Sequence, residues 1–215
     1  MILYDPQNRD EWLRCRLKGI GGSDAGAVLG VSKYKTNVEL WREKTGIQKN
    51  TFTGNAATEY GKSAEAHIRE MFLLDHPEYS SEYHEYRMHG NEIYHFIYAT
   101  LDGELVEKKT GRQGILEIKT STIQNPKQWD EWENRIPDVY YTQILHQLLA
   151  TGFRFVDLRA YLRYYKDGEL RATVRDYHIE RDEVQDDITT LVQAEIRFWQ
   201  CVLERREPAL ILPGI

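Results

Sequence analysis

The chain has 215 residues, of which 41% are hydrophobic and 29% charged, and its 28 Lys and Arg against 34 Asp and Glu give a net charge of −6. This length fits one domain with a full core, and the composition excludes disordered, collagen-like and coiled-coil chains. No apolar run approaches the ~20 residues that span a bilayer, and the first residues lack the pattern of a secretory signal. Cys15 and Cys201 are too few for a disulfide framework or a four-cysteine metal site, so we expect reduced thiols in a cytosolic protein.

The chain shows no internal repeat and no linker-like segment, so we expect residues 1–215 to form a single domain. Its first third is expected to be helical, because capping residues and apolar spacing favour helices there. Four helices are expected there. Two cover residues 8–18 and 25–29, a third begins at the capping-box pair Thr36 and Glu39 and ends at Gly46, and the fourth covers residues 56–75.

After residue 80 the apolar pattern changes to the two-residue period of strands. The expected strands cover residues 83–88, 93–99, 103–107 and 114–121, followed by helices at about 126–134 and 138–151. Two further strands, 154–164 and 170–179, flank an Asp-Gly pair that suits a two-residue hairpin turn, and a last helix covers about 181–205. Helices before, within and after a central sheet predict an α/β fold with a mixed sheet.

Charge is unevenly distributed along the chain. Residues 1–50 hold 9 Lys and Arg against 6 Asp and Glu, residues 61–107 hold 3 against 10, and residues 108–135 hold 6 against 4. This pattern has two interpretations. The acidic block can be a solvated acidic face, or its carboxylates can surround a metal ion while the basic segments on either side bind a polyanion.

The strand expected at 114–121 carries the most informative chemistry. Glu117 and Lys119 project from one face of this strand, whereas the other face is mainly apolar and is expected to be the buried one. With Asp102 arriving from a preceding hairpin, two carboxylates form a natural oxygen ligand set for Mg²⁺. A nearby lysine can then assist metal-dependent hydrolysis of a phosphodiester. The competing interpretation is an ordinary Glu–Lys pair on a solvated strand, with Asp102 as a turn residue.

The segment Gly-Ile-Gly-Gly-Ser-Asp at 19–24 leads directly into a predicted helix. Its glycines let backbone N–H groups approach an anion, and Ser23 can cap the helix while it touches a phosphate. Arg16, seven residues before Ser23, can supply a bidentate phosphate contact. The alternative is a glycine-rich turn with a capping serine.

Two of the expected helices carry further candidates. Glu65 borders the core-facing stripe of its helix and can reach inward as a third carboxylate, although an exposed glutamate is the commoner case. Gln143 and Gln147 lie four residues apart on an otherwise apolar helix. A side-chain amide there can hold a water or a phosphate. The alternative is a glutamine at the edge of the core whose hydrogen bonds are made with the backbone.

Taken together, these motifs resemble the YqaJ-like viral recombinase family, the family of phage lambda exonuclease, in both order and spacing. The resemblance covers roughly residues 10–200 and includes the run from Ile179 to Glu183 into the last helix. The motifs are Arg16 with Gly-Ile-Gly-Gly-Ser-Asp, Tyr60-Gly61 with Glu65, Leu101-Asp102-Gly103, Glu117-Ile118-Lys119, and Tyr140 with Gln143. The resemblance implies a PD-(D/E)XK, restriction-endonuclease-like core with a central mixed sheet flanked by helices. Leu101 stands where the superfamily name has proline, which ligates nothing.

The resemblance also implies a metal site. Asp102, Glu117 and the main-chain carbonyl of Ile118 would hold Mg²⁺, for which Mn²⁺ can substitute. Lys119 would activate or position the attacking water, and Glu65 would line the site as a further candidate ligand. No zinc is expected, because the histidines lack zinc-type spacing.

The remaining implications concern DNA. Gln143 would line the catalytic site, and Arg16 with Ser23 would bind the 5′-terminal phosphate. The implied activity is 5′→3′ degradation of one strand from a duplex end, which leaves 3′ overhangs and mononucleotides for recombination by strand annealing. The resemblance further implies a homotrimeric ring, a single-strand annealing protein as partner, and a phage or prophage origin in a bacterial host.

Two alternatives remain: a non-processive endonuclease with the same metal core, and a DNA-end binding module without hydrolysis. The Arg16 and Ser23 motif argues against the first, and the intact Asp102, Glu117 and Lys119 argue against the second. A chain with only two cysteines cannot be a nuclease with an iron–sulfur cluster. A scaffolding protein is also rejected, because every motif would then have to occur by chance.

Overall fold

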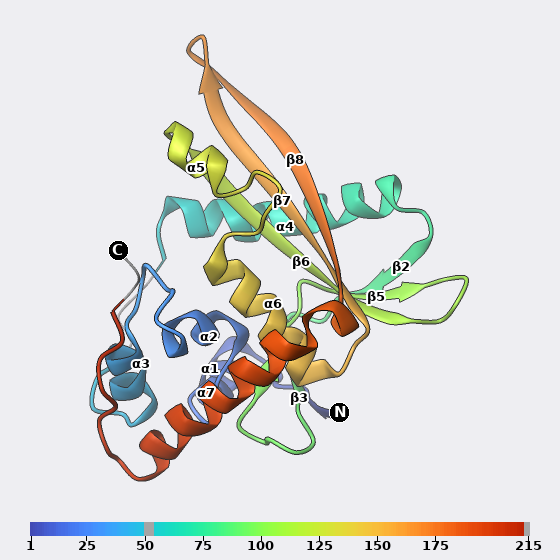
Figure 1. Cartoon of the computed structure of the whole chain (residues 1–215). Helices are drawn as coiled ribbons and strands as arrows, with labels where there is room; N and C mark the ends of the chain where they lie inside the picture. The colour runs from blue at the N-terminus through green and yellow to red at the C-terminus, as the bar shows by residue number, and fades with distance from the viewer. Residues whose placement is uncertain (50–53, 213–215) are drawn as a thin grey trace.

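The computed structural model describes residues 1–49 and 54–212 and is built around a five-stranded sheet of order β2-β5-β6-β7-β8 (Figure 1). These strands are β2 (Tyr79–Glu82), β5 (Gly103–Glu107), β6 (Gln113–Ile123), β7 (Phe155–Lys166) and β8 (Glu169–Glu180). Only β6 and β7 pair in parallel within this sheet, and its other neighbours are antiparallel, so the predicted mixed sheet is confirmed. A separate small sheet contains β1 (Ile2–Tyr4), β3 (Met88–Gly90) and β4 (Tyr98–Ala99).

The helices lie close to their expected positions. They are α1 (Arg9–Arg16), α2 (Gly22–Val28), α3 (Asn37–Lys44), α4 (Ala56–Asp75), α5 (Pro126–Asp130), α6 (Asp138–Thr151) and α7 (Gln185–Leu203), which follows a 3₁₀ turn, η1 (Arg181–Val184). The capping box expected at Thr36 and Glu39 is present, because the Thr36 hydroxyl accepts from the Glu39 N–H and the Glu39 carboxylate accepts from the Thr36 N–H. Within the described ranges, no helix is both long enough and apolar enough to cross a membrane.

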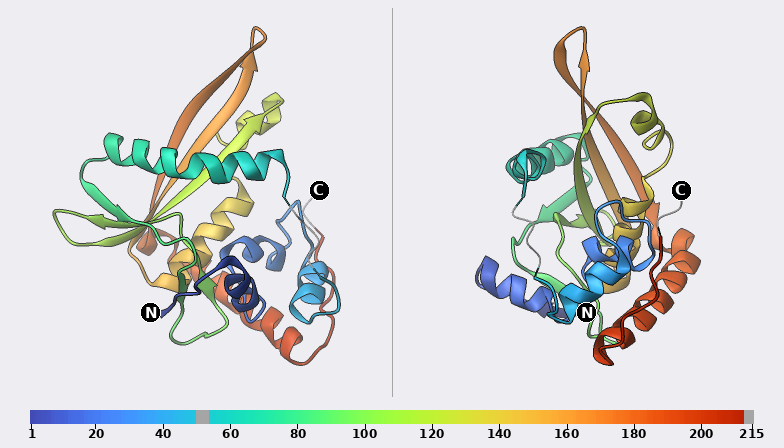
Figure 2. Two further views of the ribbon diagram at one scale, coloured as in Figure 1. Left: turned by 180° about the vertical axis from the view of Figure 1, so that it is seen from behind. Right: turned by 90° about the vertical axis from the view of Figure 1, so that its left-hand side faces the viewer.

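Helices cover both faces of the five-stranded sheet, with α4 on one side and α6 and α7 on the other (Figure 2). Under α4, Ile68 and Phe72 pack on Leu116 and Ile118 of β6. On the opposite side, Ile115 belongs to the larger core that includes apolar residues of α6 and α7. Both faces of β6 are therefore buried, and the prediction of a single buried face was wrong. The apolar pattern of one strand cannot reveal a helix that comes from elsewhere in the chain to cover its other face.

Two expected strands differ from the structure. Residues 83–87 form a turn between β2 and β3, where the Arg69 guanidinium stacks on Tyr83 and Trp12 packs near Tyr86. Tyr83 and Tyr86 lie three positions apart in this segment and contact two helices rather than the two faces of a sheet. Of residues 93–99, only Tyr98 and Ala99 form a strand, because the Asn91 side chain accepts from the N–H groups of residues 93 and 94 and closes a turn.

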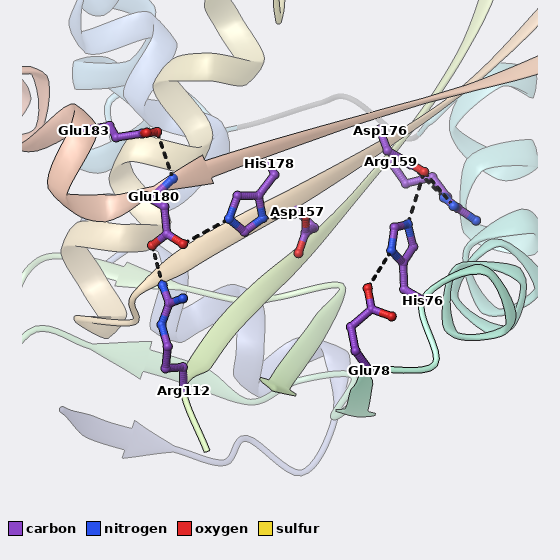
Figure 3. Close-up of polar contacts among 9 residues, drawn as sticks. All are labelled: His76, Glu78, Arg112, Asp157, Arg159, Asp176, His178, Glu180 and Glu183. Atoms are coloured by element: carbon purple, nitrogen blue, oxygen red, sulfur yellow. Dashed lines mark hydrogen bonds and ion pairs between the residues drawn. The ribbon is translucent and has the colours of Figure 1, made fainter. Parts of the chain in front are cut away.

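The predicted hairpin of β7 and β8 is confirmed, and its end extends beyond the helices (Figure 1). Asp167 and Gly168 have φ angles of 55° and 79°, so both central turn residues occupy the left-handed region that two-residue hairpin turns of type I′ require. Near its other end, the hairpin carries a network of ion pairs that reaches the end of α4 (Figure 3). Arg159, with 2% of its side chain exposed, is bound there by Asp75 and Asp176.

The His178 imidazole belongs to a second polar cluster of the hairpin and bonds Asp157 at 2.9 Å and Glu180 at 3.2 Å (Figure 3). The hydrogen bond with Asp157 outweighs partial burial and raises the pKa of His178 to about 9. The folded state therefore binds the proton more tightly than the unfolded chain, whose histidine pKa is about 6.5. This interaction stabilises the fold fully below about pH 6.5, and its contribution is lost as the pH rises through about 9.

We expect the His178→Gln variant to be less stable than the parent protein at pH 6, with a difference that shrinks towards pH 9.5. Urea unfolding of both proteins at pH 6, 7.5 and 9.5 measures this difference, and His67→Gln on the exposed side of α4 is the matched control. A difference that stays constant across this range would show that the His178 charge does not stabilise the fold.

Candidate active site

A cavity of about 330 Å³ opens between the N-terminal helices, α4 and the segment that leads into β5. It brings together five residues that the sequence singled out: Arg16, Ser23, Glu65, Asp102 and Gln143. Its other lining residues are mostly aromatic, basic or small, with one further carboxylate and one leucine: Arg9, Trp12, Gly21, Gly22, Lys62, Tyr83, Glu85, Tyr86, Tyr98, Thr100 and Leu101. A concave surface that gathers carboxylates at one end and an arginine at the other is suited to a polar, anionic ligand.

The Glu117 carboxylate lies behind this cavity and is only 1% exposed. Gln143 and Gln147 each donate a side-chain N–H to it, one to each oxygen, at 2.6 Å. These glutamines are one helical turn apart on α6, so both face β6. The Lys119 ammonium also contacts Glu117, as the two-residue spacing on one strand face predicts. Three donors thus compensate a charge that burial alone would make very costly.

Asp102 reaches β6 at the point where β5 stops pairing with it. The β5–β6 register begins with Gly103 opposite Leu116, which leaves the edge of β6 free at Ile118. One Asp102 carboxylate oxygen accepts the Ile118 N–H at 2.8 Å in place of a neighbouring strand. In an extended strand the N–H and C=O of one residue project towards the same edge, so the Ile118 carbonyl faces the Asp102 side as well.

Burial and neighbouring negative charge raise the pKa of two carboxyl groups of this site. Burial and the nearby Glu117 raise the pKa of Asp102 well above its usual range, against the opposing influence of Lys119. Burial also raises the pKa of Glu65, which lines the cavity from α4. For Lys119, burial disfavours the charge, but Glu117 and Asp102 outweigh it and raise the pKa. One ammonium thus does not offset all the negative charge that the three carboxylates would carry together.

This donor set fits a hard divalent cation. Asp102, Glu117 and the Ile118 carbonyl offer oxygen atoms on adjoining segments, and an added positive charge would relieve the repulsion that raises the Asp102 pKa. Among the described residues, no three His, Cys, Asp or Glu side chains converge as a complete ligand group. A cation held here would therefore keep several water molecules, which is the usual behaviour of Mg²⁺ in proteins.

The other end of the cavity is formed by Arg16 and Ser23. Arg16 ends α1 and donates to the Ser23 hydroxyl at 2.7 Å, while its guanidinium lies over the Trp12 ring. Ser23 is not the capping residue we expected: Gly21 is the N-cap of α2, and the Asp24 carboxylate accepts the Gly21 N–H. The Asp24 N–H in turn donates to the Gly21 carbonyl, and the Ser23 hydroxyl accepts from Arg16.

The glycines before α2 are required by close packing, not by a left-handed backbone. A Cβ on Gly19 would lie 2.3 Å from the Phe96 carbonyl oxygen, which no rearrangement of a side chain could relieve. A Cβ on Gly22 would lie 3.2 Å from Gln143 on α6. Because these positions lack side chains, the Arg16 end of the cavity can approach the helix that carries the glutamines.

Gln147 is the contact of this site that sequence reasoning missed. Its four-residue spacing from Gln143 was visible in the sequence, but nothing local showed that both side chains meet the same carboxylate. Trp12 and Tyr98 were also missed: Trp12 stacks under Arg16, and the Tyr98 hydroxyl donates to the Arg16 and Gly19 carbonyls.

The fold is that of the PD-(D/E)XK nucleases, as the comparison with solved structures shows. An alkaline exonuclease from Laribacter hongkongensis matches with a TM-score of 0.63 and 22% identity over 92% of this chain and 97% of that one. Its complex with dAMP matches with a TM-score of 0.62 and 22% identity over 93% and 95% of the two chains. A phage related exonuclease from Haemophilus somnus 129PT matches with a TM-score of 0.59 and 15% identity over 87% of this chain and 96% of that one.

The chain belongs to the YqaJ-like viral recombinase family, whose domain model matches residues 11–154. The uncharacterized protein YqaJ of Bacillus subtilis (strain 168) is 35% identical over an alignment of 217 residues that covers 94% of this chain. The chain spans only 59% of the length of that relative. The family and the PD-(D/E)XK core therefore agree with the resemblance that the motifs indicated.

Proposed function

We propose that the protein is a divalent-metal-dependent nuclease that degrades one strand of duplex DNA in the 5′→3′ direction from an end. The observation that carries this proposal is the single cavity that joins Asp102 and its neighbours to the Arg16–Ser23 pair. The exonucleases that share the fold, one of them solved with dAMP, support the same substrate class.

Mg²⁺ is the cation we propose, with Mn²⁺ as a substitute, held by Asp102, Glu117 and the Ile118 carbonyl, while Glu65 lines the cavity nearby as a candidate for a further ligand. When bound, the cation would neutralise charge on the scissile phosphate and favour ionisation of the attacking water. Gln143 and Gln147 would hold the Glu117 carboxylate in one orientation. The Lys119 ammonium would position the water and stabilise charge that develops on the phosphate.

Arg16 and Ser23 would bind the 5′-terminal phosphate of the strand being degraded. A guanidinium offers two parallel N–H donors to a phosphate, and the Ser23 hydroxyl already lies within hydrogen-bond distance of it. Binding of a terminal phosphate beside the catalytic carboxylates favours cleavage at a chain end, which distinguishes an exonuclease from an endonuclease with the same metal core.

Four further parts of the proposal rest on the family alone. We place this single-domain nuclease in phage-type recombination, with 3′ overhangs as its product and a single-strand annealing protein as its partner. A homotrimeric ring around DNA would allow processive action by a protein of net charge −6, because enclosure replaces many phosphate contacts.

We expect linear duplex DNA with 5′-phosphate ends to be degraded to mononucleotides in the presence of Mg²⁺, faster than DNA with 5′-hydroxyl ends. The Arg16→Ala variant should lose this preference, with a fall of ~10–100-fold on phosphorylated ends, because charge-assisted hydrogen bonds are worth ~1.5–3 kcal/mol. Arg14→Ala is the matched control, since Arg14 is exposed on the same helix and does not line the cavity.

The same assay discriminates the alternatives. Cutting of covalently closed circular DNA would identify an endonuclease and would contradict the end-dependent reaction. Tight binding of DNA ends without cleavage, with either Mg²⁺ or Mn²⁺, would leave a DNA-end binding module.

A further inference from the structure

We propose that the buried Asp24–Lys44 ion pair positions the pocket for the terminal phosphate, and this inference rests on the function proposed above for Arg16 and Ser23. Neither residue lines the cavity, so the pair would act through the backbone rather than by contact with DNA. Asp24 and Lys44 are therefore positioning residues and not catalytic ones.

The pair connects the two helices that form the pocket. Lys44, the last residue of α3, contacts an Asp24 carboxylate oxygen at 2.7 Å, and its side chain is only 5% exposed. The same ammonium donates to the Arg16 carbonyl at the end of α1 at 2.8 Å. The same Asp24 oxygen accepts the Gly21 N–H at the start of α2 at 3.1 Å. A single ion pair thus holds both ends of the segment between Arg16 and Ser23.

That segment needs an external constraint. It contains Gly19 and Gly21, which restrict the backbone less than any other residue type. Backbone hydrogen bonds of Ile20 with Phe96 and Tyr98 anchor the middle of the segment. The Tyr98 hydroxyl donates to the Arg16 and Gly19 carbonyls, and the ion pair adds a contact at each end. If the segment moved, Arg16 and Ser23 would no longer share the geometry in which they are 2.7 Å apart.

Stability alone does not explain why these charges are buried. An apolar pair of similar size is often as stable as a buried ion pair, because removing two charges from water is costly. Here burial would raise the pKa of Asp24, but Lys44 and Arg16 outweigh it and lower the pKa to about 2. The carboxylate therefore stays ionised beside the Arg16 guanidinium and can help to hold it in place.

The decisive variant is the double substitution Asp24→Asn with Lys44→Met, which removes both charges together and leaves no unpaired buried ion. We expect the preference for 5′-phosphate over 5′-hydroxyl ends to fall about tenfold, while cleavage of 5′-hydroxyl ends changes less than twofold. Metal-free binding of the two kinds of oligonucleotide duplex should lose the same preference. The matched control is Arg159→Met with Asp176→Asn, which removes an ion pair with a buried arginine outside the pocket and should keep the preference.

The outcomes separate this inference from the proposed function. A parent protein that shows no preference for 5′-phosphate ends contradicts the phosphate pocket itself. A parent protein that shows the preference, together with a double variant that retains it, overturns the role of the ion pair alone.

Two further measurements cover a double variant that does not fold. Asp24→Asn alone keeps the shape of the side chain, and its preference should fall in the same direction. In the parent protein, the Gly21 amide should be protected from hydrogen exchange, since it donates to Asp24. An unprotected Gly21 amide would overturn the inference without any variant.

Discussion

Replacing Lys119 with alanine is expected to reduce cleavage of linear duplex DNA by ~10³-fold or more, while the affinity for DNA ends changes only a few-fold. Loss of a proton-transfer group costs ~10²–10⁴-fold, and loss of a donor that stabilises developing charge costs ~10²–10³-fold. DNA-end binding should persist because the Arg16–Ser23 pair is untouched, and Glu117 keeps two amide donors.

Single-turnover cleavage and metal-free DNA binding measure these two effects separately. Lys109→Ala is a suitable control, because Lys109 is exposed in the turn between β5 and β6. Near-normal turnover by the Lys119→Ala protein would remove this residue from the proposed mechanism. Equal losses of binding and cleavage would point instead to a collapse of the site around Glu117.

The second large effect concerns stability and the pair formed by His146 and Glu195, both 0% exposed. One ring nitrogen of His146 bonds Glu195 at 2.6 Å, and the other must donate to the Tyr98 carbonyl, which can only accept. Burial lowers the pKa of His146, but Glu195 outweighs it and raises the pKa, so the contact with Glu195 favours the charged imidazole. His146→Leu would leave the buried Glu195 side chain without this partner.

We expect His146→Leu to reduce the free energy of unfolding by ~3–5 kcal/mol, the usual cost of removing one partner of a buried pair. For a protein of this size, the Tm should fall by ~6–20 °C. The double variant His146→Leu with Glu195→Leu should recover most of this loss, since replacing a whole buried pair with apolar residues is often neutral. Urea and thermal unfolding measure both proteins, and a double variant as unstable as the single one would show that shape rather than charge decides the cost.

The elements that could be predicted from the sequence carry their own local signals. The two-residue spacing placed Glu117 and Lys119 on one face of β6, and the structure joins them in an ion pair. The Asp-Gly pair at 167–168 fixed the hairpin, because its backbone geometry belongs to those two residues. Caps and helical spacing similarly located most helices.

The errors occurred where distant segments decide the outcome. The face of β6 that carries Glu117 is buried because α6 covers it, and Gln147 contacts Glu117 from 30 residues away. Residues 83–88 were expected to form a strand, yet their aromatic side chains contact two helices. The sequence indicated Ser23 as the capping residue, but Gly21 is the N-cap and the Asp24 carboxylate accepts its N–H. Asp24 is held there by Lys44, which lies on another helix.

The position of β8 at the border of the sheet has a consequence for behaviour at high protein concentration. An edge strand of twelve residues presents unpaired N–H and C=O groups that can template aggregation by strand addition. In β8, charged side chains interrupt this edge at Glu169, Arg171, Arg175, Asp176 and Glu180. An added strand would have to desolvate these groups, so the charged residues of β8 protect the protein from uncontrolled association. Two of them, Asp176 and Glu180, also take part in the polar contacts of the hairpin.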